Sequence, residues 1–501
     1  MATDMKNENA NHLEDIETST SDEQAADVPE YDAKETQRIL RKVDYRLLPM
    51  LTLLYVLSFI DRSNIGNAKV AGMNSDLGLT GPQYNIALTV FFFPYALFEV
   101  PSNVVLKLVK PSIWIGCMMI AWGTVMTLMG IVQSYGGLVG ARVALGFAET
   151  GFFPASTFLL TTWYRRFELQ TRMAVFFSAA SLAGAFSGLL AYAIQNMDGI
   201  CGLRGWRWIF ILEGIATVGV GAGCFALLPD GPAEAAAFLS VRERRFLVRR
   251  LRMDAGTRTG RVETADAFSW PAVRAALGEW KIWCAVVVYW GNSISLYGFT
   301  YSAPSVILNL GYTAAAAQLL TIPIYILGAI ATIIVSYWAD RRQKRWPFIA
   351  GPFCVAAGGF LGLLCIPHPR LPGLTYALLF CVPAGVYPPL IGVLAWVGNN
   401  LAPSWKRAVG MALLISVGNL GGAVGCNVYL EAEAPHYWLG FGFGLGISLA
   451  AVAATLVLKV AYERLNAEKE AVGSEEEVRA RWGEEELRRM GDRSPLFRYA
   501  V

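Results

Sequence analysis

The chain has 501 residues, of which 54% are hydrophobic and only 16% are charged. Soluble globular proteins carry about 25% charged residues, and they need this polar surface to remain in water. Together with a mean hydropathy of +0.41, the composition excludes a soluble globular protein and predicts a chain that crosses a lipid bilayer many times. The formal net charge is only +3, and we expect no nucleic-acid partner.

Residues 1–44 form an acidic segment that contains serine and threonine and has no apolar run. This pattern differs from that of a secretory signal peptide and predicts a disordered tail. The eight cysteines lie mostly in apolar segments and predict no disulfide framework. The three histidines, His12, His368 and His436, fall in tails or loops. We therefore expect neither a metal site in the core nor a cofactor.

Twelve apolar segments follow, each long enough for a membrane-spanning helix of about 20 residues. A polar stretch at residues 229–280 separates six of these segments from the other six. They lie near residues 47–67, 83–106, 112–133, 137–160, 173–194, 207–228, 281–303, 315–338, 347–366, 373–397, 407–429 and 437–460. The pattern predicts an all-α transmembrane bundle with two six-helix halves, residues 45–228 and 281–462.

Basic residues are concentrated in alternate loops. Four of them, Arg38, Arg41, Lys42 and Arg46, precede the first span, and others follow the second, fourth, eighth and tenth spans, whereas the loops between carry few. Cytoplasmic loops of membrane proteins are enriched in Lys and Arg. The pattern therefore predicts that both tails, the second of which is residues 463–501, face the cytosol together with the linker.

Two further patterns concern helices. Ser240-Val241-Arg242-Glu243 is a capping box that opens a basic helix in the linker, and we expect this helix to lie near anionic lipid headgroups. Glycine pairs spaced by four residues, Gly184 with Gly188 and Gly421 with Gly425, allow helix backbones to approach closely. They predict tight helix packing within the bundle.

Four ionisable residues lie within the predicted spans of the first half: Asp61, Arg62, Arg142 and Glu149. A charged group in the middle of a membrane costs about 2.5–3.5 kcal/mol on insertion scales, and such groups mark functional sites. Arg142 and Glu149 are seven residues apart, so a helix projects both from nearly one face, and both can line one cavity. Asp61 and Arg62 are adjacent and cannot share a face.

Counting these charges suggests a mechanism. The four groups balance when both carboxyls are ionised, and two positive charges remain when both are protonated. Protonation and anion binding should therefore favour each other. Arginine binds a carboxylate through two parallel hydrogen bonds. The residues thus predict proton-coupled transport of a small organic anion, with Asp61 and Glu149 as proton carriers and Arg62 and Arg142 as anion ligands.

Other polar residues in the spans are uncharged or lie near span ends. Asn292, Tyr297 and Asn419 of the second half offer hydrogen bonds for the body of a substrate, with interfacial aromatic residues as the alternative reading. Glu99 lies near the cytosolic end of the second span, where a gate or loop anchor is expected. For Glu213 we expect a local partner.

Several segments resemble one family. The two six-span halves joined by a cytosolic loop resemble the major facilitator superfamily, and residues 339–345, which include Asp340 and Arg341, resemble its loop signature after the eighth span. The copy after the second span lacks the Asp-Arg pair, which resembles the fungal allantoate permease family of the anion:cation symporters. Further motifs of that family match at residues 46–49, 59–68, 99–103, 163–166, 205–210, 227–230, 320–323 and 418–422.

The resemblance covers residues 37–465, is nearest to nicotinate permeases, and implies a twelve-helix bundle around a central cavity. It also implies roles for particular residues: proton coupling and carboxylate recognition for Asp61, Arg62, Arg142 and Glu149, substrate contact for Tyr95, and a loop anchor for Asp340 and Arg341.

We thus expect a monomeric secondary transporter in the plasma membrane that takes up a monocarboxylate such as nicotinate, allantoate or pantothenate with protons by alternating access. One alternative is an exporter of a secondary metabolite from the same superfamily, and another is a membrane receptor that senses a nutrient. A membrane enzyme is not expected, because the sequence has no phosphate-binding loop, catalytic triad pattern or metal cluster.

Overall fold

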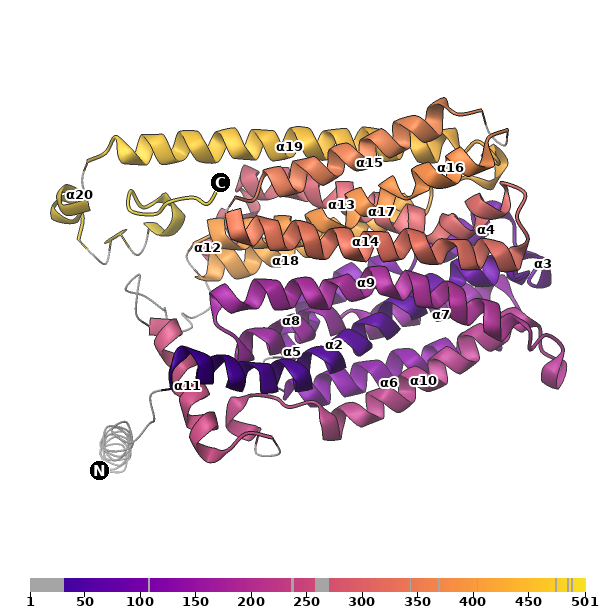
Figure 1. Ribbon diagram of the computed structural model, residues 1–501, viewed down its shortest axis with the longest axis horizontal. Helices are drawn as coiled ribbons and strands as arrows, with labels where there is room; N and C mark the ends of the chain where they lie inside the picture. Colours follow the sequence, from indigo (N-terminus) through magenta and orange to yellow (C-terminus); the bar gives the residue numbers. More distant parts are fainter. Residues whose placement is uncertain are drawn as a thin grey trace.

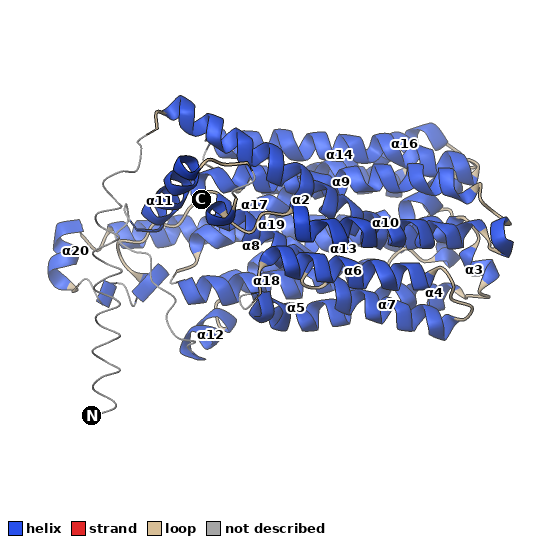
Figure 2. Cartoon of the chain, turned by 90° about the horizontal axis from the view of Figure 1, so that it is seen from below, coloured by secondary structure: helices blue, strands red, loops and turns tan. Residues whose placement is uncertain are grey.

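The computed structural model describes residues 31–501 apart from 107–108, 236–237, 257–269, 343, 368–369, 403, 474, 484–485 and 488–489. Every regular element in this part of the chain is a helix, and the long helices run side by side in one bundle (Figure 1). The view at a right angle also shows only helices and loops (Figure 2). The predicted all-α fold is confirmed. Most of the N-terminal tail, which is predicted to be disordered, lies outside the described residues.

The first half begins with α2 (Ala33–Val70) and the short α3 (Met73–Asp76). Its other helices are α4 (Gly81–Thr89), α5 (Phe92–Leu106), α6 (Pro111–Met129), α7 (Tyr135–Glu149), α8 (Phe152–Trp163), α9 (Arg166–Gln195) and α10 (Gly205–Leu227). The linker holds α11 (Val241–Gly256) and α12 (Trp270–Leu277). Figure 1 shows α11 lying across one end of the bundle.

The second half repeats the arrangement of long helices. It comprises α13 (Trp280–Leu308), α14 (Ala314–Arg342), α15 (Pro347–Cys365), α16 (Pro372–Leu379), α17 (Cys381–Asn400), α18 (Ser404–Gly425) and α19 (Trp438–Glu470), with α20 (Glu475–Arg481) beyond it. Among the described residues, ten helical segments are long and apolar enough to cross a membrane. The other two predicted spans correspond to α4 with α5 and to α18, whose apolar part, Val409–Gly425, is shorter.

Three predicted spans are broken helices, and proline explains each break. The second parts of these spans, α5, α8 and α17, each have a proline as their third residue: Pro94, Pro154 and Pro383. Proline has no N–H group, and its ring clashes with the carbonyl of the residue four positions earlier. That earlier residue lies at the break in all three spans. The breaks therefore follow from the local sequence.

The two halves meet along α9 and α14 and along α5 and α18. Figure 1 shows α9 and α14 running next to each other through the middle of the molecule. Gly188 of α9 makes this approach possible, because a Cβ atom there would lie 2.6 Å from the carbonyl oxygen of Gln318. In the same way, a Cβ atom at Gly425 would lie 2.5 Å from the carbonyl oxygen of Ile294. The glycine pairs thus serve helix packing.

Helical structure extends into both predicted tails: the first long helix begins before the predicted end of the N-terminal tail, and the last long helix ends after the predicted start of the C-terminal tail. α2 begins at Ala33, so residues 33–44 are helical. Contacts outside the apolar spans hold this first part of α2: Arg172 binds both carboxylate oxygens of Asp44 at 2.7 and 2.9 Å, and Lys42 pairs with Glu243 of α11 at 2.6 Å. Hydropathy could not reveal this extension, because tertiary ion pairs stabilise it.

The C-terminal segment also folds onto the helical bundle. Lys406 at the start of α18 pairs with Asp492 at 2.8 Å and with Glu279 at 2.6 Å, and the Trp396 ring N–H donates to the carbonyl of Ala500 at 2.8 Å. Burial alone would raise the pKa of the Glu279 carboxyl, but the hydrogen bond from Lys406 and the nearby lysine charges outweigh burial and lower that pKa. The segment after α19 is therefore partly structured.

Candidate functional site

A cavity lies between the two halves of the bundle. The first half contributes residues from α2, α5, α8 and α9, and the second half contributes residues from α13, α17 and α18. The lining residues are Tyr55, Ser58, Phe59, Arg62, Tyr95, Phe152, Phe153, Phe177, Tyr289, Asn292, Ser293, Leu296, Tyr297, Leu390 and Asn419. Among these residues, Arg62 alone carries a charge. The cavity is therefore aromatic, with one cationic group.

Arg62 of α2 is 6% exposed and binds residues of both halves. Its Nη2 atom donates to Oε1 of Glu149 at 2.6 Å, and its Nη1 atom donates to the hydroxyl of Tyr297 on α13. Its Nε atom has no hydrogen-bond partner. The guanidinium thus joins a carboxylate of the first half to a hydroxyl of the second half and keeps a free donor.

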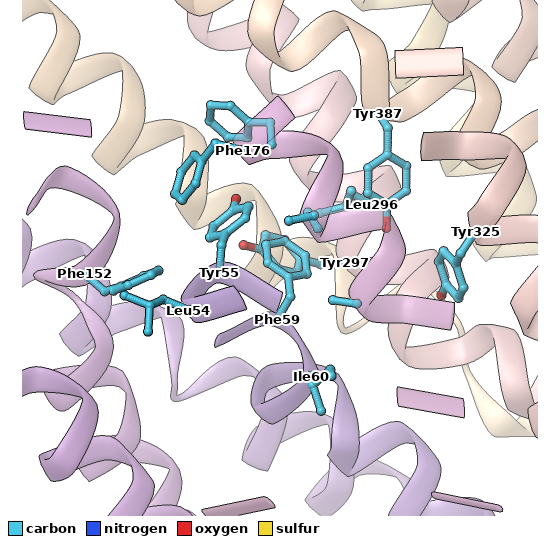
Figure 3. Close-up of a cluster of buried hydrophobic side chains, with 14 of the residues drawn as sticks. Leu54, Tyr55, Phe59, Ile60, Phe152, Phe176, Leu296, Tyr297, Tyr325 and Tyr387 are labelled. Atoms are coloured by element: carbon cyan, nitrogen blue, oxygen red, sulfur yellow. The ribbon is translucent and has the colours of Figure 1, made fainter. Parts of the chain in front are cut away.

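Aromatic rings surround the Arg62 guanidinium. The carbon at its centre lies 5.0 Å from the centre of the Tyr95 ring, 5.1 Å from that of Phe91 and 5.5 Å from that of Phe59. Such cation–π contacts partly replace the water that burial removes. Figure 3 shows Tyr55 and Phe59 beside Leu296 and Tyr297 of the opposite half. An aromatic substrate would find ring faces on both sides of the cavity.

Glu149, the last residue of α7, is held by two groups of α2. Besides Arg62, the hydroxyl of Ser58 donates to the same carboxylate oxygen at 2.6 Å, and the other oxygen has no partner. Ser58 and Arg62 are four residues apart and therefore lie on one face of the helix. Sequence reasoning missed Ser58, although this spacing from Arg62 could have indicated it.

Arg142 lies on α7 two turns before Glu149 and is fully buried. Its Nε atom donates to the carbonyl of Ala87 at 3.2 Å, whereas Nη1 and Nη2 have no partner. It lies 5.0 Å from the centre of the Phe91 ring, the ring that Arg62 also contacts. The structure therefore separates Arg142 from Glu149, although their spacing predicts a shared cavity, because Glu149 is turned to α2.

Asp61 points away from the cavity. Its Oδ2 atom accepts hydrogen bonds from the Trp122 ring N–H of α6 at 3.0 Å and from the Thr217 hydroxyl of α10 at 2.8 Å. Successive residues of an α-helix point in directions about 100° apart, so Arg62 faces the cavity while Asp61 faces the core of the first half. The side chain of Asn64, one turn later, donates to Glu213 of α10. The expected local partner of Glu213 is therefore wrong.

The predicted polar residues of the second half, Asn292, Tyr297 and Asn419, all line the cavity. The amide of Asn292 donates to the carbonyl of Val386 on α17, and Asn419 accepts a hydrogen bond from the Tyr289 hydroxyl at 3.4 Å. These contacts hold the side chains in place without a charge. Tyr95, from the first half, lines the same cavity.

The predicted gate and loop residues lie outside the cavity. Glu99 of α5 is buried and accepts a hydrogen bond from the Ser416 hydroxyl of α18 at 3.2 Å, so it connects the two halves. Asp340 at the end of α14 binds Arg345 at 3.0 Å within its own loop, and Arg341 is exposed beside the Trp338 ring.

The end of the bundle opposite α11 and α20, which we call the distal end (right in Figure 1), is joined across the two halves. Lys69 of α2 pairs with Glu431 at 3.2 Å, and the amide of Asn427 donates to the Thr89 hydroxyl at 2.7 Å. A Cβ atom at Gly66 would lie 3.0 Å from the carbonyl oxygen of Tyr301. The described contacts therefore close the distal side of the cavity.

A two-half helical bundle with a cavity between the halves is the architecture of a membrane transporter. The model of the Major Facilitator Superfamily matches residues 51–426 of the chain, and the chain belongs to this superfamily.

Curated relatives agree. The MFS-type transporter cnsO of Penicillium expansum is 36% identical over 477 residues, which cover 93% of this chain and 90% of that protein. The high-affinity nicotinic acid transporter of Saccharomyces cerevisiae is 31% identical over 470 residues, which cover 94% and 85%. The major facilitator-type transporter hxnP of Emericella nidulans is 30% identical over 479 residues, which cover 93% and 94%.

Solved structures show the same fold. A bacterial homologue of the human lysosomal transporter Spinster, in an inward-facing and unoccupied conformation, has a TM-score of 0.60 at 16% identity and covers 83% of this chain and 94% of that chain. Two predictions are confirmed: that the chain belongs to the major facilitator superfamily, and that it is a transporter and not an enzyme. Membership of the allantoate permease family stays a prediction.

Proposed function

We propose that this transporter moves a small organic monocarboxylate together with protons. The observation that carries the proposal is the Arg62–Glu149 pair at the cavity wall. A proton on Glu149 would remove the negative partner of Arg62 and leave a buried cation beside an empty cavity. A substrate carboxylate would then take the place of Glu149 on the guanidinium, since arginine binds carboxylates bidentately.

Arg142 adds to the attraction for an anion. It is a buried cation whose two Nη atoms have no partner, and burial of an uncompensated charge is costly. The Phe91 ring contacts both Arg142 and Arg62. We infer that a carboxylate bound to Arg62 also lowers the cost of the Arg142 charge.

The rest of the cavity suits an aromatic or similarly flat substrate. Tyr297 and Tyr95 present rings, and Asn292 and Asn419 present amides, without a second charge. One relative is named a high-affinity nicotinic acid transporter, so nicotinate is the first substrate to test. Allantoate and pantothenate are the next candidates, and we propose a monomer in the plasma membrane with both termini in the cytosol.

Alternating access would rock the two halves about this cavity. The distal contacts Lys69–Glu431 and Asn427–Thr89 would break when the distal side opens. The contact between Glu99 and Ser416 would respond to movement of α5 against α18, which is the role expected of a gate.

Uptake of labelled nicotinate, allantoate and pantothenate tests the proposal in cells that lack their own permeases. We expect uptake that increases at acidic outside pH and that loses this pH dependence in Glu149→Gln, since glutamine cannot exchange a proton. Surface labelling would show that both proteins reach the plasma membrane. Absence of uptake by a surface-exposed wild-type protein, with efflux of a preloaded compound under an imposed pH gradient, would contradict import and favour export.

A further inference from the structure

A second pair of acidic residues is buried behind the cavity wall, between α2, α6 and α10. Asp61 is 2% exposed and Glu213 is 5% exposed. Among the described residues, no lysine or arginine forms an ion pair with either carboxyl: the neighbouring Arg62 binds Glu149 and Tyr297. The transport mechanism proposed above does not involve Glu213.

The hydrogen bonds place the two carboxyls close together. Asp61 accepts a bond from Thr217, which lies one turn after Glu213 on α10. Glu213 accepts a bond from Asn64, which lies one turn after Asp61 on α2. Residues three or four positions apart share a helix face. Each carboxyl is therefore bonded to the helical neighbour of the other, and the two interact electrostatically.

Each carboxyl has one satisfied oxygen and one orphaned oxygen. The donors from Trp122, Thr217 and Asn64 all reach Oδ2 of Asp61 or Oε2 of Glu213. The buried atoms Oδ1 of Asp61 and Oε1 of Glu213 have no partner. A protonated carboxyl has an O–H group that can donate. One proton would therefore supply the donor that these two oxygens lack.

The groups that surround the pair do not offset two negative charges. α6 contributes the Trp122 ring, α10 contributes the Thr217 hydroxyl, and α9 contributes the Ser187 hydroxyl, which donates to the side-chain amide oxygen Oδ1 of Asn64 at 3.2 Å. On the cavity side the Arg62 charge is engaged by Glu149, which itself repels Asp61. Two like charges at close range in a low-dielectric site do not both ionise.

We propose that Asp61 and Glu213 form a carboxyl dyad that holds one shared proton behind the cavity. The part that concerns transport rests on the proposed proton coupling. The dyad itself does not, because a shared proton is a property of the folded protein. Removal of either carboxyl then removes the like charge that adds to burial in holding the proton on the other.

Thermal unfolding of the purified protein in detergent tests the dyad without a substrate. A native state that keeps a proton which the unfolded chain releases loses stability as pH rises. We expect the wild-type Tm to fall across neutral to alkaline pH, and to fall less in Glu213→Gln and in Asp61→Asn. The effects of the two substitutions should not add in the double variant, because both act on one shared proton. Parallel curves for the wild type and the single variants would overturn the dyad.

The same measurement distinguishes a proton from a metal cation. At constant ionic strength, replacing choline chloride by sodium chloride should leave the Tm of the wild type unchanged relative to Glu213→Gln. A rise in Tm with sodium that requires both carboxyls would show that a cation occupies the pair and would overturn the assignment to a proton.

Labelled nicotinate uptake against outside pH tests the role in transport. Loss of the Glu213 charge makes Asp61 release its proton more readily, so Glu213→Gln should shift the half-maximal pH to lower values by about one unit, a tenfold change in proton concentration. Glu213→Asp keeps the charge and should leave the half-maximal pH near that of the wild type. Wild-type uptake without pH dependence would contradict the proposed function, whereas an unshifted Glu213→Gln profile beside a pH-dependent wild type would contradict only the role of Glu213.

Discussion

At the scale of single residues, the site depends on which partner each arginine has. Arg62 faces the cavity with Glu149 and Tyr297 as partners, whereas Arg142 is buried and contacts the Ala87 carbonyl and the Phe91 ring. The two arginines are therefore not equivalent. Arg62 lines the cavity, whereas Arg142 does not line it and contacts the Phe91 ring, which Arg62 also contacts.

This difference predicts unequal effects of arginine-to-lysine substitutions. Arg62→Lys keeps the charge but loses the fork, and a hydrogen bond to a charged group contributes about 1.5–3 kcal/mol. The KM for nicotinate should rise at least about tenfold. Arg142→Lys should have the smaller effect on KM, since Arg142 does not line the cavity. Initial uptake rates over a range of concentrations measure both, and a normal KM in Arg62→Lys would show that the bidentate assignment is wrong.

At the scale of helices, close packing depends on small side chains at particular crossings. The α9–α14 crossing places Gly188 against the backbone of Gln318. In contrast, Gly446 of α19 has no atom near the position of an added Cβ. The number of glycines in a helix therefore does not show which glycine is needed for close packing. The residue that faces each glycine across the helix–helix interface shows it.

Alanine at these two glycines should have opposite effects on stability. Gly188→Ala forces the helices apart and should lower the free energy of unfolding by about 1–3 kcal/mol. Gly446→Ala adds helix propensity of up to about 1 kcal/mol without a clash and serves as the control. Thermal unfolding in detergent compares them. Equal Tm values for the two variants would contradict the close crossing of α9 and α14.

The linker helix α11 is attached to the bundle by ion pairs, and one of them should depend on pH. Arg250 binds Glu168 at the start of α9 through two hydrogen bonds. Burial alone would raise the pKa of Glu168, but the hydrogen bond and charge of Arg250 outweigh burial and lower that pKa. The contribution of Glu168 to stability is then present above the unfolded pKa of about 4.3 and lost as pH falls through the lowered value.

Hydrogen exchange of α11 amides measures this attachment. At neutral pH, Glu168→Gln should exchange faster than the wild type in α11. The difference should shrink as pH falls below about 4, where Glu168 of the wild type is protonated too. Glu463→Gln on α19, whose pair with Lys459 is remote from α11, is the matched control. Unchanged α11 exchange in Glu168→Gln at neutral pH would argue against the attachment.

At the scale of the whole molecule, the two halves contact each other at the distal end, and these contacts close one side of the cavity. Lys69 and Glu431 are the ion pair of this closure, and the Glu431 side chain is 59% exposed. Exposed pairs contribute about 0–1 kcal/mol. This ion pair therefore contributes little to the free energy of the closure.

Charge reversal tests this closure. Lys69→Glu and Glu431→Lys should each shift the population toward the distally open state by up to about fivefold, and the double reversal should restore the wild-type balance. Labelling of a cysteine introduced at Tyr301, beside Gly66 at the distal contact, reports the accessible fraction. If the double variant is as accessible as the single variants, the ion pair does not contribute to closure.

The sequence by itself determined the membrane class and the positions of the spans. These features are local, because a backbone in lipid must satisfy its own hydrogen bonds and apolar runs therefore become helices. It also identified Asp61, Arg62, Arg142 and Glu149 as the buried charges of the first half, because ionisable residues are rare in apolar segments.

Only the tertiary structure decided which of these charges meet. The partners Arg62 and Glu149 are 87 residues apart, and Asn64 and Glu213 are 149 apart. Spacing along a helix tells which residues share a face, but the helix that covers this face depends on the packing of the whole bundle. For that reason Arg142 and Glu149, which share a helix, have separate surroundings, whereas Arg62 and Tyr297 from opposite halves form one site.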